Sequence, residues 1–205
     1  MPVFTIVAGP NGAGKSSYSD IYANGAVIHD ADKHKVALQN LHPGLDISDE
    51  YLYSHLAECY QTFEGHALLQ FNSMLVETNL RDDYLIGRAH YMRSLGYTIN
   101  MIFVALENTI ISKERVKQRV DGNGHRVGVF AIEENFRMGL INLKKHVGLF
   151  DNFILATPDL REIGASIQPP KPILRLSAGH IIYYRRYREV WANELAEELI
   201  ALATK

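Results

Sequence analysis

The sequence predicts an α/β protein of the three-layer P-loop NTPase type, with a mostly parallel sheet, helices on both faces and a helical lid. Two observations support this prediction. Short, uncharged runs rich in β-branched residues alternate along the chain with longer segments of helical character. Such an alternation requires crossover connections between parallel strands. The first of these runs also leads directly into a glycine-rich segment that a helix follows, which is the context of a phosphate-binding loop.

Apolar runs mark the predicted strands, because a strand buried on both faces reads as a continuous hydrophobic segment. In chain order, strands are expected at residues 3–8, 26–28, 73–76, 97–106 and 153–156. A β-like stretch at 173–184 follows Pro169, Pro170 and Pro172 and fits the alternating pattern least well.

Capping residues and turn formers set the limits of the predicted helices. These helices are expected at residues 14–24, 47–71 (as one or two helices), 82–95, 108–120, 132–147 and 187–203. Asp46 or Ser48 is expected to cap the second segment and Asn108 the fourth, while Gly96 suits the end of the third. The elements predict a single P-loop kinase-like domain over residues 1–205, with a lid at about 108–130 and a C-terminal extension at about 169–205.

Composition excludes several classes of protein. The 21 Lys and Arg residues against 23 Asp and Glu give a net charge of −2, which argues against a protein whose main work is coating nucleic acid. No apolar run approaches the roughly 18 residues of a membrane-spanning helix, and the first residues lack the basic start of a signal peptide. Cys59 is the only cysteine and cannot form an internal disulfide. We therefore expect a cytoplasmic protein with no membrane or nucleic-acid partner.

One segment resembles a nucleic-acid-binding patch despite this composition. Arginines and aromatic residues interleave in Tyr183-Tyr184-Arg185-Arg186-Tyr187-Arg188. Because the net charge is slightly negative, the sequence favours a packed or partner-facing segment over a nucleic-acid site.

The glycine-rich segment Gly9-Pro10-Asn11-Gly12-Ala13-Gly14-Lys15-Ser16-Ser17 satisfies the pattern G-x-x-x-x-G-K-[ST]. Glycines allow the backbone to curl and direct its N–H groups at phosphate oxygens, and the following helix adds its positive end. Lys15 is expected to reach the β- and γ-phosphates of a nucleotide, and the Ser16 hydroxyl to bind Mg²⁺.

A glycine-rich turn without function is the alternative to a phosphate loop. The sequence has no Asn-Lys-x-Asp run, which disfavours a GTPase, and no strongly hydrophobic strand ending in Asp-Glu, which disfavours a motor-type ATPase.

Acidic residues follow two of the predicted strands. Asp30 and Asp32 lie just past the second strand, at the sheet edge where ligands of open α/β sheets bind. A carboxylate there can take the proton of an acceptor hydroxyl, and we assign this role to Asp32, with Asp30 or a simple helix cap as alternatives. Glu77 ends the third strand and can hold a substrate hydroxyl or a metal-bound water. Arg81 can hold a phosphate, although a surface charge pair would look the same.

Two arginines, Arg115 and Arg119, lie on one face of a predicted helix that runs into Gly122-Asn123-Gly124-His125-Arg126. A helix–loop–helix with basic tips suits a lid that closes on a triphosphate and excludes water, as a kinase requires. A solvated helix face is the alternative.

Taken in order, these motifs resemble the zeta-toxin family of P-loop kinases over about residues 3–155. The phosphate loop is joined by Asp32, by Glu77-Thr78-Asn79-Leu80, by Arg115, Arg119 and His125 in one segment, and by Asp151-Asn152. The resemblance implies ATP or GTP with Mg²⁺ and phosphorylation of a sugar hydroxyl on a UDP-N-acetyl amino sugar such as UDP-N-acetylglucosamine. It implies that Asp32 is the catalytic aspartate, that Glu77 and Asn79 contact the substrate, and that Arg115, Arg119 and His125 grip phosphate. Members of the family are often toxins neutralised by a small antitoxin.

The sequence also departs from the family's pattern at several positions. Asn79 replaces the usual threonine, Gly128 a common proline, Asn135 an arginine, and Phe153 a serine. Two other functions therefore remain open: a kinase for another small metabolite such as a sugar or nucleoside, and a nucleotide-dependent binding protein that recruits a partner.

Overall fold

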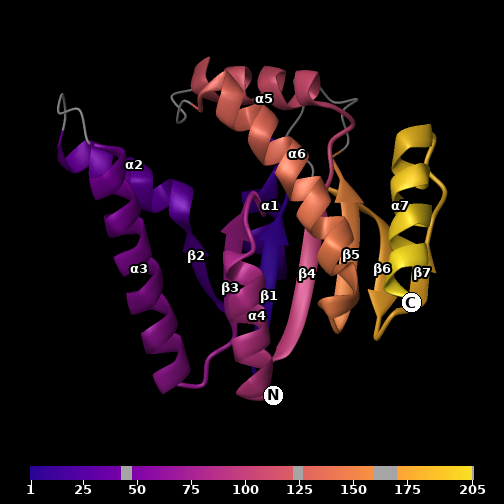
Figure 1. Cartoon of the computed structure of the whole chain (residues 1–205), viewed down its shortest axis with the longest axis horizontal. Helices are drawn as coiled ribbons and strands as arrows, with labels where there is room; N and C mark the ends of the chain where they lie inside the picture. Colours follow the sequence, from indigo (N-terminus) through magenta and orange to yellow (C-terminus); the bar gives the residue numbers. More distant parts are fainter. Residues whose placement is uncertain (43–47, 122–126, 159–169, 205) are drawn as a thin grey trace.

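A seven-stranded sheet forms the centre of the protein, in the order β2-β3-β1-β4-β5-β6-β7 (Figure 1). The computed structural model describes residues 1–42, 48–121, 127–158 and 170–204. The first five strands run parallel, and the last two are antiparallel to their neighbours. The strands are β1 (Val3–Ala8), β2 (Val27–Asp30), β3 (Met74–Thr78), β4 (Thr98–Val104), β5 (Asn152–Thr157), β6 (Lys171–Ser177) and β7 (His180–Tyr184).

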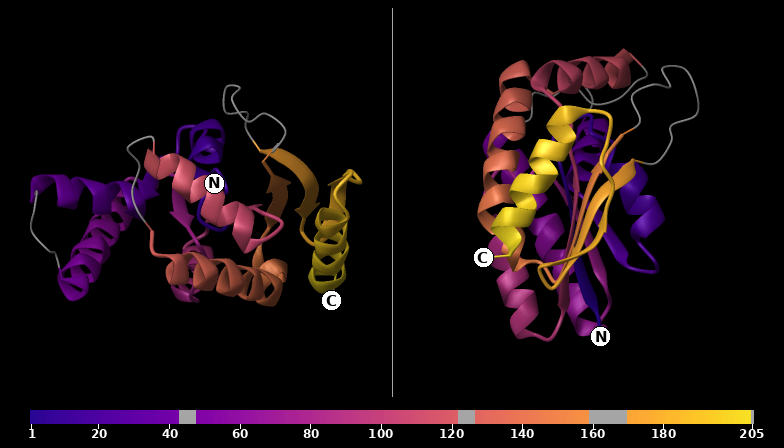
Figure 2. Two further views of the ribbon diagram at one scale, coloured as in Figure 1. Left: turned by 90° about the horizontal axis from the view of Figure 1, so that it is seen from above. Right: turned by 90° about the vertical axis from the view of Figure 1, so that its right-hand side faces the viewer.

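Helices cover both faces of the sheet. They are α1 (Lys15–Tyr22), α2 (Ala31–Leu41), α3 (Asp49–Leu69), α4 (Tyr84–Ser94), α5 (Thr109–Asp121), α6 (Val129–His146) and α7 (Val190–Ala203), with a 3₁₀ turn at Val147–Leu149. Helices α4, α6 and α7 lie on one face and α1 on the other, while α2 and α3 stand beside the edge strand β2 (Figures 1 and 2). Helix α5 crosses above the carboxyl ends of the parallel strands.

Two hydrophobic clusters separate these layers. The larger lies between the sheet and helices α3, α4, α6 and α7, and the smaller lies on the α1 side. The central strand β1 contributes to both, because Ile6 points into the first and Val7 into the second. Burial of each such side chain stabilises the fold by about 1.5–3 kcal/mol. This two-sided burial explains why β1 reads as a continuous apolar run.

The predicted α/β fold with a mostly parallel sheet is confirmed. The C-terminal stretch, which fitted the pattern least well, is the antiparallel hairpin β6–β7 with Ala178 and Gly179 at its turn, both at positive φ. Ser48 and Asn108 cap α3 and α5 as expected, since their side chains accept hydrogen bonds from the Tyr51 and Ile111 amides. Asp46 lies outside the described residues.

Side-chain contacts set the starts of two helices. Helix α2 begins at Ala31 because the Asp30 side chain caps it. Helix α7 begins at Val190 rather than at 187, because the Asn193 side chain bonds both the N–H and the carbonyl of Tyr187 and holds that residue outside the helix.

None of the helices in the described residues has the length and apolar character needed to cross a bilayer.

Candidate active site

The predicted phosphate loop connects β1 to α1 at the carboxyl end of the sheet. Gly9, Gly12 and Gly14 all have positive φ, at 142°, 76° and 92°. A Cβ at Gly9 would collide with the Val104 carbonyl oxygen, and one at Gly12 would lie 2.9 Å from the Arg115 Cβ. The glycines are therefore required both by backbone conformation and by close packing. Ser17 lies half-buried in the first turn of α1.

Helices α5 and α6 hold this loop from outside through buried polar contacts. The Ser112 hydroxyl donates to the Asn11 carbonyl at 2.6 Å, and the Asn135 side chain donates to Asn11 Oδ1 at 2.8 Å. All three residues are buried. Arg115 Nε donates to the Gly12 carbonyl at 2.5 Å. The sequence placed Asn11 and Arg115 in the site, but Ser112 carried no signal of its own.

Lys15 lies at the centre of the candidate site. Its ammonium donates to the Gly9 carbonyl at 2.9 Å, the Pro10 carbonyl at 3.2 Å and Asn79 Oδ1 at 2.8 Å. These three contacts use all three donors of the group. Burial lowers the pKa of Lys15, while the charges of Asp32 and Glu77 act in the opposite direction.

Glu77 reaches the other signature residue of the loop. The Ser16 hydroxyl donates to Glu77 Oε2 at 3.0 Å, across the paired strands β1 and β3. Glu77 is buried, and its Oε1 has no hydrogen-bond partner among the residues that the structure describes. Burial raises the pKa of this carboxyl, with the charge of Asp30 as a second cause, and the hydroxyls of Ser19 and Ser16 oppose the rise.

The oxygens of Ser16 and Glu77 fit a hard divalent cation such as Mg²⁺. A hydroxyl and a buried carboxylate with an orphaned oxygen are the ligand types that Mg²⁺ takes, directly or through water. Within the described ranges, no group of three or more His, Cys, Asp and Glu residues gathers at one point.

The two aspartates after β2 have different surroundings. Asp30 Oδ1 accepts hydrogen bonds from the amides of Asp32 and Lys33 at 3.0 and 3.3 Å, so Asp30 caps α2. The Asp32 carboxylate lies in the first turn of α2, half-buried, and makes no hydrogen bond with the described residues. Asp32 is the largest of the charges that raise the pKa of Lys15. The structure therefore brings the Asp32 carboxylate to the phosphate loop and commits the Asp30 carboxylate to the helix cap.

The connection after β3 carries Asn79 and Arg81, and helix α6 supports it. Asn142 donates to the Leu80 carbonyl at 2.9 Å, and a Cβ at Gly139 would lie 2.6 Å from the Asn79 carbonyl oxygen. Asn79 joins the site through Lys15. Arg81 is exposed, and the structure does not bring it into this network.

The two arginines of α5 that the sequence assigns to a lid differ in their exposure. Arg115 is half-buried against the phosphate loop, and burial lowers its pKa. Arg119 is exposed, and its charge lowers the pKa of Lys15, which places it on the same side of the molecule. His125 and the glycines Gly122 and Gly124 lie outside the described residues.

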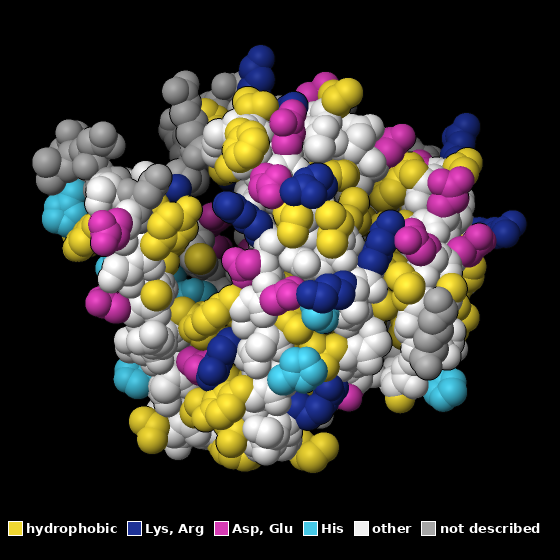
Figure 3. All heavy atoms as spheres, in the orientation of Figure 1, with side chains coloured by type: hydrophobic (Ala, Val, Ile, Leu, Met, Phe, Trp, Pro, Cys, Tyr) yellow, Lys and Arg dark blue, Asp and Glu magenta, His cyan; other side chains and the backbone are white. Residues whose placement is uncertain are grey.

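Beside these residues the surface is hollowed. Figure 3 shows a recess between the projecting α2–α3 pair and the body of the molecule, with acidic side chains in its wall. The recess faces the carboxyl ends of β2 and β3, where Asp32 and Glu77 lie.

No protein-family model matches the sequence, and no curated protein matches it. Among solved structures, a chain of the AvrRxo1-ORF1:AvrRxo1-ORF2 complex with sulphate ions aligns with a TM-score of 0.68 and 16% identity. The form of that complex with ATP gives 0.67 and 15%. Both alignments cover 98% of this chain, which spans 64% of the length of its counterpart.

Two further structures have the same architecture. A chain of the PezAT chromosomal toxin–antitoxin system of Streptococcus pneumoniae aligns with a TM-score of 0.64 and 16% identity, over 100% of this chain and 88% of that one. A chain of the Pnkp1/Rnl/Hen1 RNA repair complex gives 0.57 and 16%, over 70% and 46%. At these identities the likeness concerns the fold alone: this chain shares its α/β architecture, with a mostly parallel sheet and helices around it, with chains of these complexes.

Proposed function

We propose that this protein is a small-molecule kinase that transfers the γ-phosphoryl group of ATP or GTP to an alcohol group. One observation carries the proposal. Lys15, Ser16, Asp32 and Glu77 come from three neighbouring strand ends and meet at the phosphate loop. A phosphate-binding lysine, a cation site and an uncommitted carboxylate are the groups that phosphoryl transfer to a hydroxyl needs.

The loop amides, Lys15 and the lid arginines Arg115 and Arg119 bind and orient the phosphates in this proposal. To reach a phosphate, Lys15 exchanges its present contacts with Gly9, Pro10 and Asn79 for phosphate oxygens. Ser16 would hold Mg²⁺, and its contact with Glu77 favours a role for that carboxylate at the cation or its water shell. When bound, Mg²⁺ would neutralise charge on the phosphate oxygens.

Asp32 is the general base in this proposal. Asp30 is occupied by the cap of α2, whereas the Asp32 carboxylate retains its lone pairs for a proton. It can accept the proton of the acceptor hydroxyl as the hydroxyl oxygen attacks the γ-phosphorus. His125 is proposed to add a phosphate contact and Arg81 a substrate contact, both on sequence grounds.

The acceptor that we propose is UDP-N-acetylglucosamine or a similar nucleotide sugar, bound in the recess beside α2 and α3. Its support is the sequence resemblance to zeta toxins. ATP as donor is supported by the ATP-bound AvrRxo1 complex. The two-protein AvrRxo1 and PezAT structures support a small antitoxin-like partner for this chain. A cytoplasmic location is proposed on sequence grounds alone, from the single cysteine.

The test is a reaction with ATP, Mg²⁺ and UDP-N-acetylglucosamine followed by phosphorus NMR, beside a panel of sugars and nucleosides. A new phosphomonoester signal that grows with ADP supports the proposal. A phosphomonoester signal that appears only with another acceptor would support the kinase activity but show that UDP-N-acetylglucosamine is not the substrate. Nucleotide binding without acceptor-dependent ADP release would instead favour a nucleotide-dependent binding protein. The Lys15→Ala variant controls for contaminating kinases.

A further inference from the structure

The carboxyl end of β3 contacts both residues of the phosphate loop that are expected to hold ligands. Glu77 Oε2 accepts the Ser16 hydroxyl at 3.0 Å, and Asn79 Oδ1 accepts the Lys15 ammonium at 2.8 Å. Strand β3 pairs with β1, which leads into the loop, so the two contacts lie side by side at the same end of the sheet. The end of β3 therefore reaches the two groups to which the proposed function gives a cation and a phosphate.

The two contacts differ in what ligand binding demands of them. Glu77 can keep its place when a cation binds, because a carboxylate is itself a ligand of Mg²⁺ or of its water. The Asn79 oxygen competes with phosphate, because all three donors of Lys15 are used by Asn79 and the carbonyls of Gly9 and Pro10. The two carbonyls belong to the loop backbone, so Asn79 is the contact that rotation of the acceptor's own side chain can release.

The backbone around Asn79 is held firmly in place. The Thr78 hydroxyl accepts the Leu80 amide at 3.0 Å, and the buried Leu80 has a φ of 56°, which a bulky residue rarely adopts. From α6, Asn142 donates to the Leu80 carbonyl at 2.9 Å, and Gly139 packs against the Asn79 carbonyl. The Asn79 side chain can therefore rotate away and return without any movement of the turn that carries it.

Burial strengthens the contact between Asn79 and Lys15. The ammonium lies in a buried environment that lowers its pKa, and Asn79 is half-buried. A buried charged donor without an acceptor is costly, so an amide oxygen at this point stabilises the ammonium whenever no phosphate contacts it. A nucleotide must displace this oxygen before its own phosphate can take the donor.

We infer that Asn79 is an internal competitor of the nucleotide: its amide holds Lys15 until a β- or γ-phosphate displaces it, and takes the ammonium back as the product leaves. The inference rests on the proposed function only in requiring that a nucleotide binds at the phosphate loop. Asn79, which the sequence resemblance assigns to the acceptor, thereby gains a role toward the donor and acts through Lys15. It makes the nucleotide bind more weakly and leave faster, which favours turnover where product release limits the rate.

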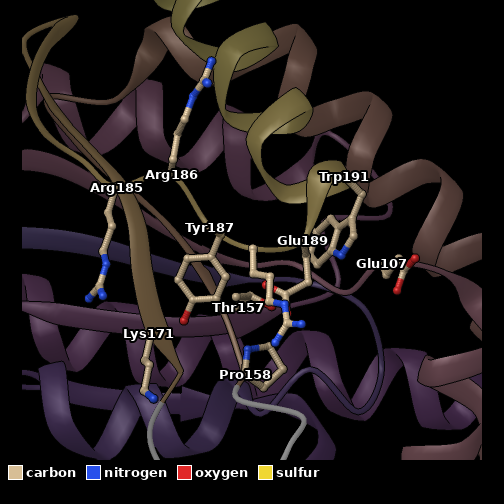
Figure 4. A pocket seen from close by; sticks show the side chains of 10 residues that line it. Glu107, Thr157, Pro158, Lys171, Arg185, Arg186, Tyr187, Glu189 and Trp191 are labelled. Atoms are coloured by element: carbon tan, nitrogen blue, oxygen red, sulfur yellow. The ribbon is translucent and has the colours of Figure 1, made fainter.

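A cavity of about 330 Å³ lies near the phosphate loop, where β5 ends and β6 begins (Figure 4). Its side chains are engaged with one another and with α7. Arg186 pairs with Glu197 at 3.2 Å, and Figure 4 shows the Glu189 side chain between Tyr187 and Trp191. Because these walls are already occupied, we assign nucleotide binding to the phosphate loop, and the titrations below report on Lys15.

The test is calorimetric titration of this chain with a non-hydrolysable ATP analogue, ADP and AMP, with Mg²⁺ and without acceptor. Asn79→Ala should bind the analogue and ADP about three- to tenfold more tightly than wild type, because one competing hydrogen bond is removed. Stopped-flow measurement should show slower release of ADP. The affinity for AMP should change by less than about twofold, because the lysine of a phosphate loop reaches the β- and γ-phosphates.

Two controls separate competition from a change in folding. Asn79→Leu keeps the volume of the side chain without its oxygen and should bind the analogue as tightly as Asn79→Ala, even if the smaller residue loosens the turn. Asn142→Ala removes a support of the same turn at Leu80 and should leave the affinity within about twofold of wild type. Equal tightening in Asn142→Ala would trace the effect to a loosened turn and overturn the inference.

The effect must also pass through Lys15. In a Lys15→Ala background, adding Asn79→Ala should change the affinity for the analogue by less than about twofold, because no ammonium is left to compete for. Tightening in both backgrounds would overturn the inference. Unchanged or weaker binding in both Asn79 variants would overturn it too and leave the proposed kinase standing. Tighter binding without phosphorylation of any acceptor would support the inference and count against the kinase.

Discussion

The phosphate-loop region and the C-terminal edge of the sheet are held together by different interactions. Around the loop, buried polar side chains such as Asn11, Ser112 and Asn135 bind one another and the backbone. At the other edge, β6 and α7 pack through apolar residues, among them Leu174 and Leu199, which are fully buried. The two regions therefore depend on different physical interactions.

This difference indicates which residues can be substituted to change function without unfolding the protein. A buried hydrogen bond contributes about 0.5–1.5 kcal/mol net and fixes a geometry, whereas burial of a large apolar side chain contributes about 1.5–3 kcal/mol and tolerates small shifts. Substitutions of the charged groups in the first region should therefore affect chemistry, and truncations in the second should affect stability.

The largest effect is expected for Asp32→Asn. An amide keeps the size of the side chain but removes the basic lone pair, so acceptor-dependent turnover should fall by about 10²–10⁴-fold. ATP affinity should stay nearly unchanged, because the loop and Lys15 supply it. Turnover and nucleotide binding are measured on the same preparation. Asp30→Asn, which retains the cap of α2, is the matched control, and a larger loss in Asp30→Asn would move the base to that residue.

Lys15→Ala is expected to lower kcat/KM by about 10²–10³-fold, the usual cost of removing one group that stabilises charge in the transition state. Chemical denaturation should show an unfolding free energy that is nearly unchanged, because burial of this ammonium is itself unfavourable. Lys33→Ala, at an exposed position, should leave turnover unaffected. A Lys15→Ala protein that unfolds much more easily would show that the loop lysine is part of the structural core, against the comparison drawn above.

At the opposite edge, Leu174→Ala should lower the unfolding free energy by about 2–5 kcal/mol, because it opens a cavity under α7. Nucleotide affinity of the remaining folded protein should be unchanged. Urea unfolding and calorimetric titration measure the two quantities. Ile181→Ala, on the exposed strand β7, should cost less than about 0.5 kcal/mol.

Acid should destabilise the protein through His29, which is buried and whose Nδ1 has no hydrogen-bond partner within the described part of the chain. Burial and the neighbouring His34 lower the pKa of His29 from 6.5 to about 4. The unfolded chain therefore binds a proton that the folded chain does not, and stability falls as the pH drops from about 6.5 to about 4, by up to about 3 kcal/mol. The difference in unfolding free energy between wild type and His29→Phe, followed across this range, isolates the effect. A difference that is independent of pH would contradict it.

The smallest effect is expected for the polar braces on α6. Asn135→Ala and Asn142→Ala each remove the partner of a buried oxygen and should cost about 1–3 kcal/mol of stability. Only Asn135→Ala should also weaken nucleotide binding, because Asn135 holds Asn11 of the phosphate loop and Asn142 holds Leu80. Equal nucleotide affinities in the two variants would show that the brace has no influence on the site.

Much of the fold could be predicted because local patterns coincide with the final environment. The run 3–8 is buried on both faces, and Ser48 and Asn108 cap the helices that they precede. The hairpin was harder to predict, because a bulge between Arg175 and Leu176 breaks the alternation of faces and β7 is largely exposed.

The contacts of the candidate site depend on strand order, which no local pattern encodes. Glu77 reaches Ser16 only because β3 lies between β2 and β1. The hydrogen bond between Asn11 and Asn135 joins residues 124 positions apart. It could not be predicted from the sequence, because it depends on how α6 packs against the phosphate loop. The sequence identified the residue types of the phosphate loop, while the roles of Asp32, Glu77 and the lid arginines stay predictions.

The antiparallel hairpin has a consequence for the folding of this protein during its synthesis on the ribosome. The parallel core is complete once β5 has emerged, and until β6 follows, the open side of β5 exposes Leu155 and its unpaired backbone groups. Such an edge pairs readily with other chains. We therefore expect a nascent chain that is paused after β5 to require chaperone protection, which the arrival of the hairpin ends.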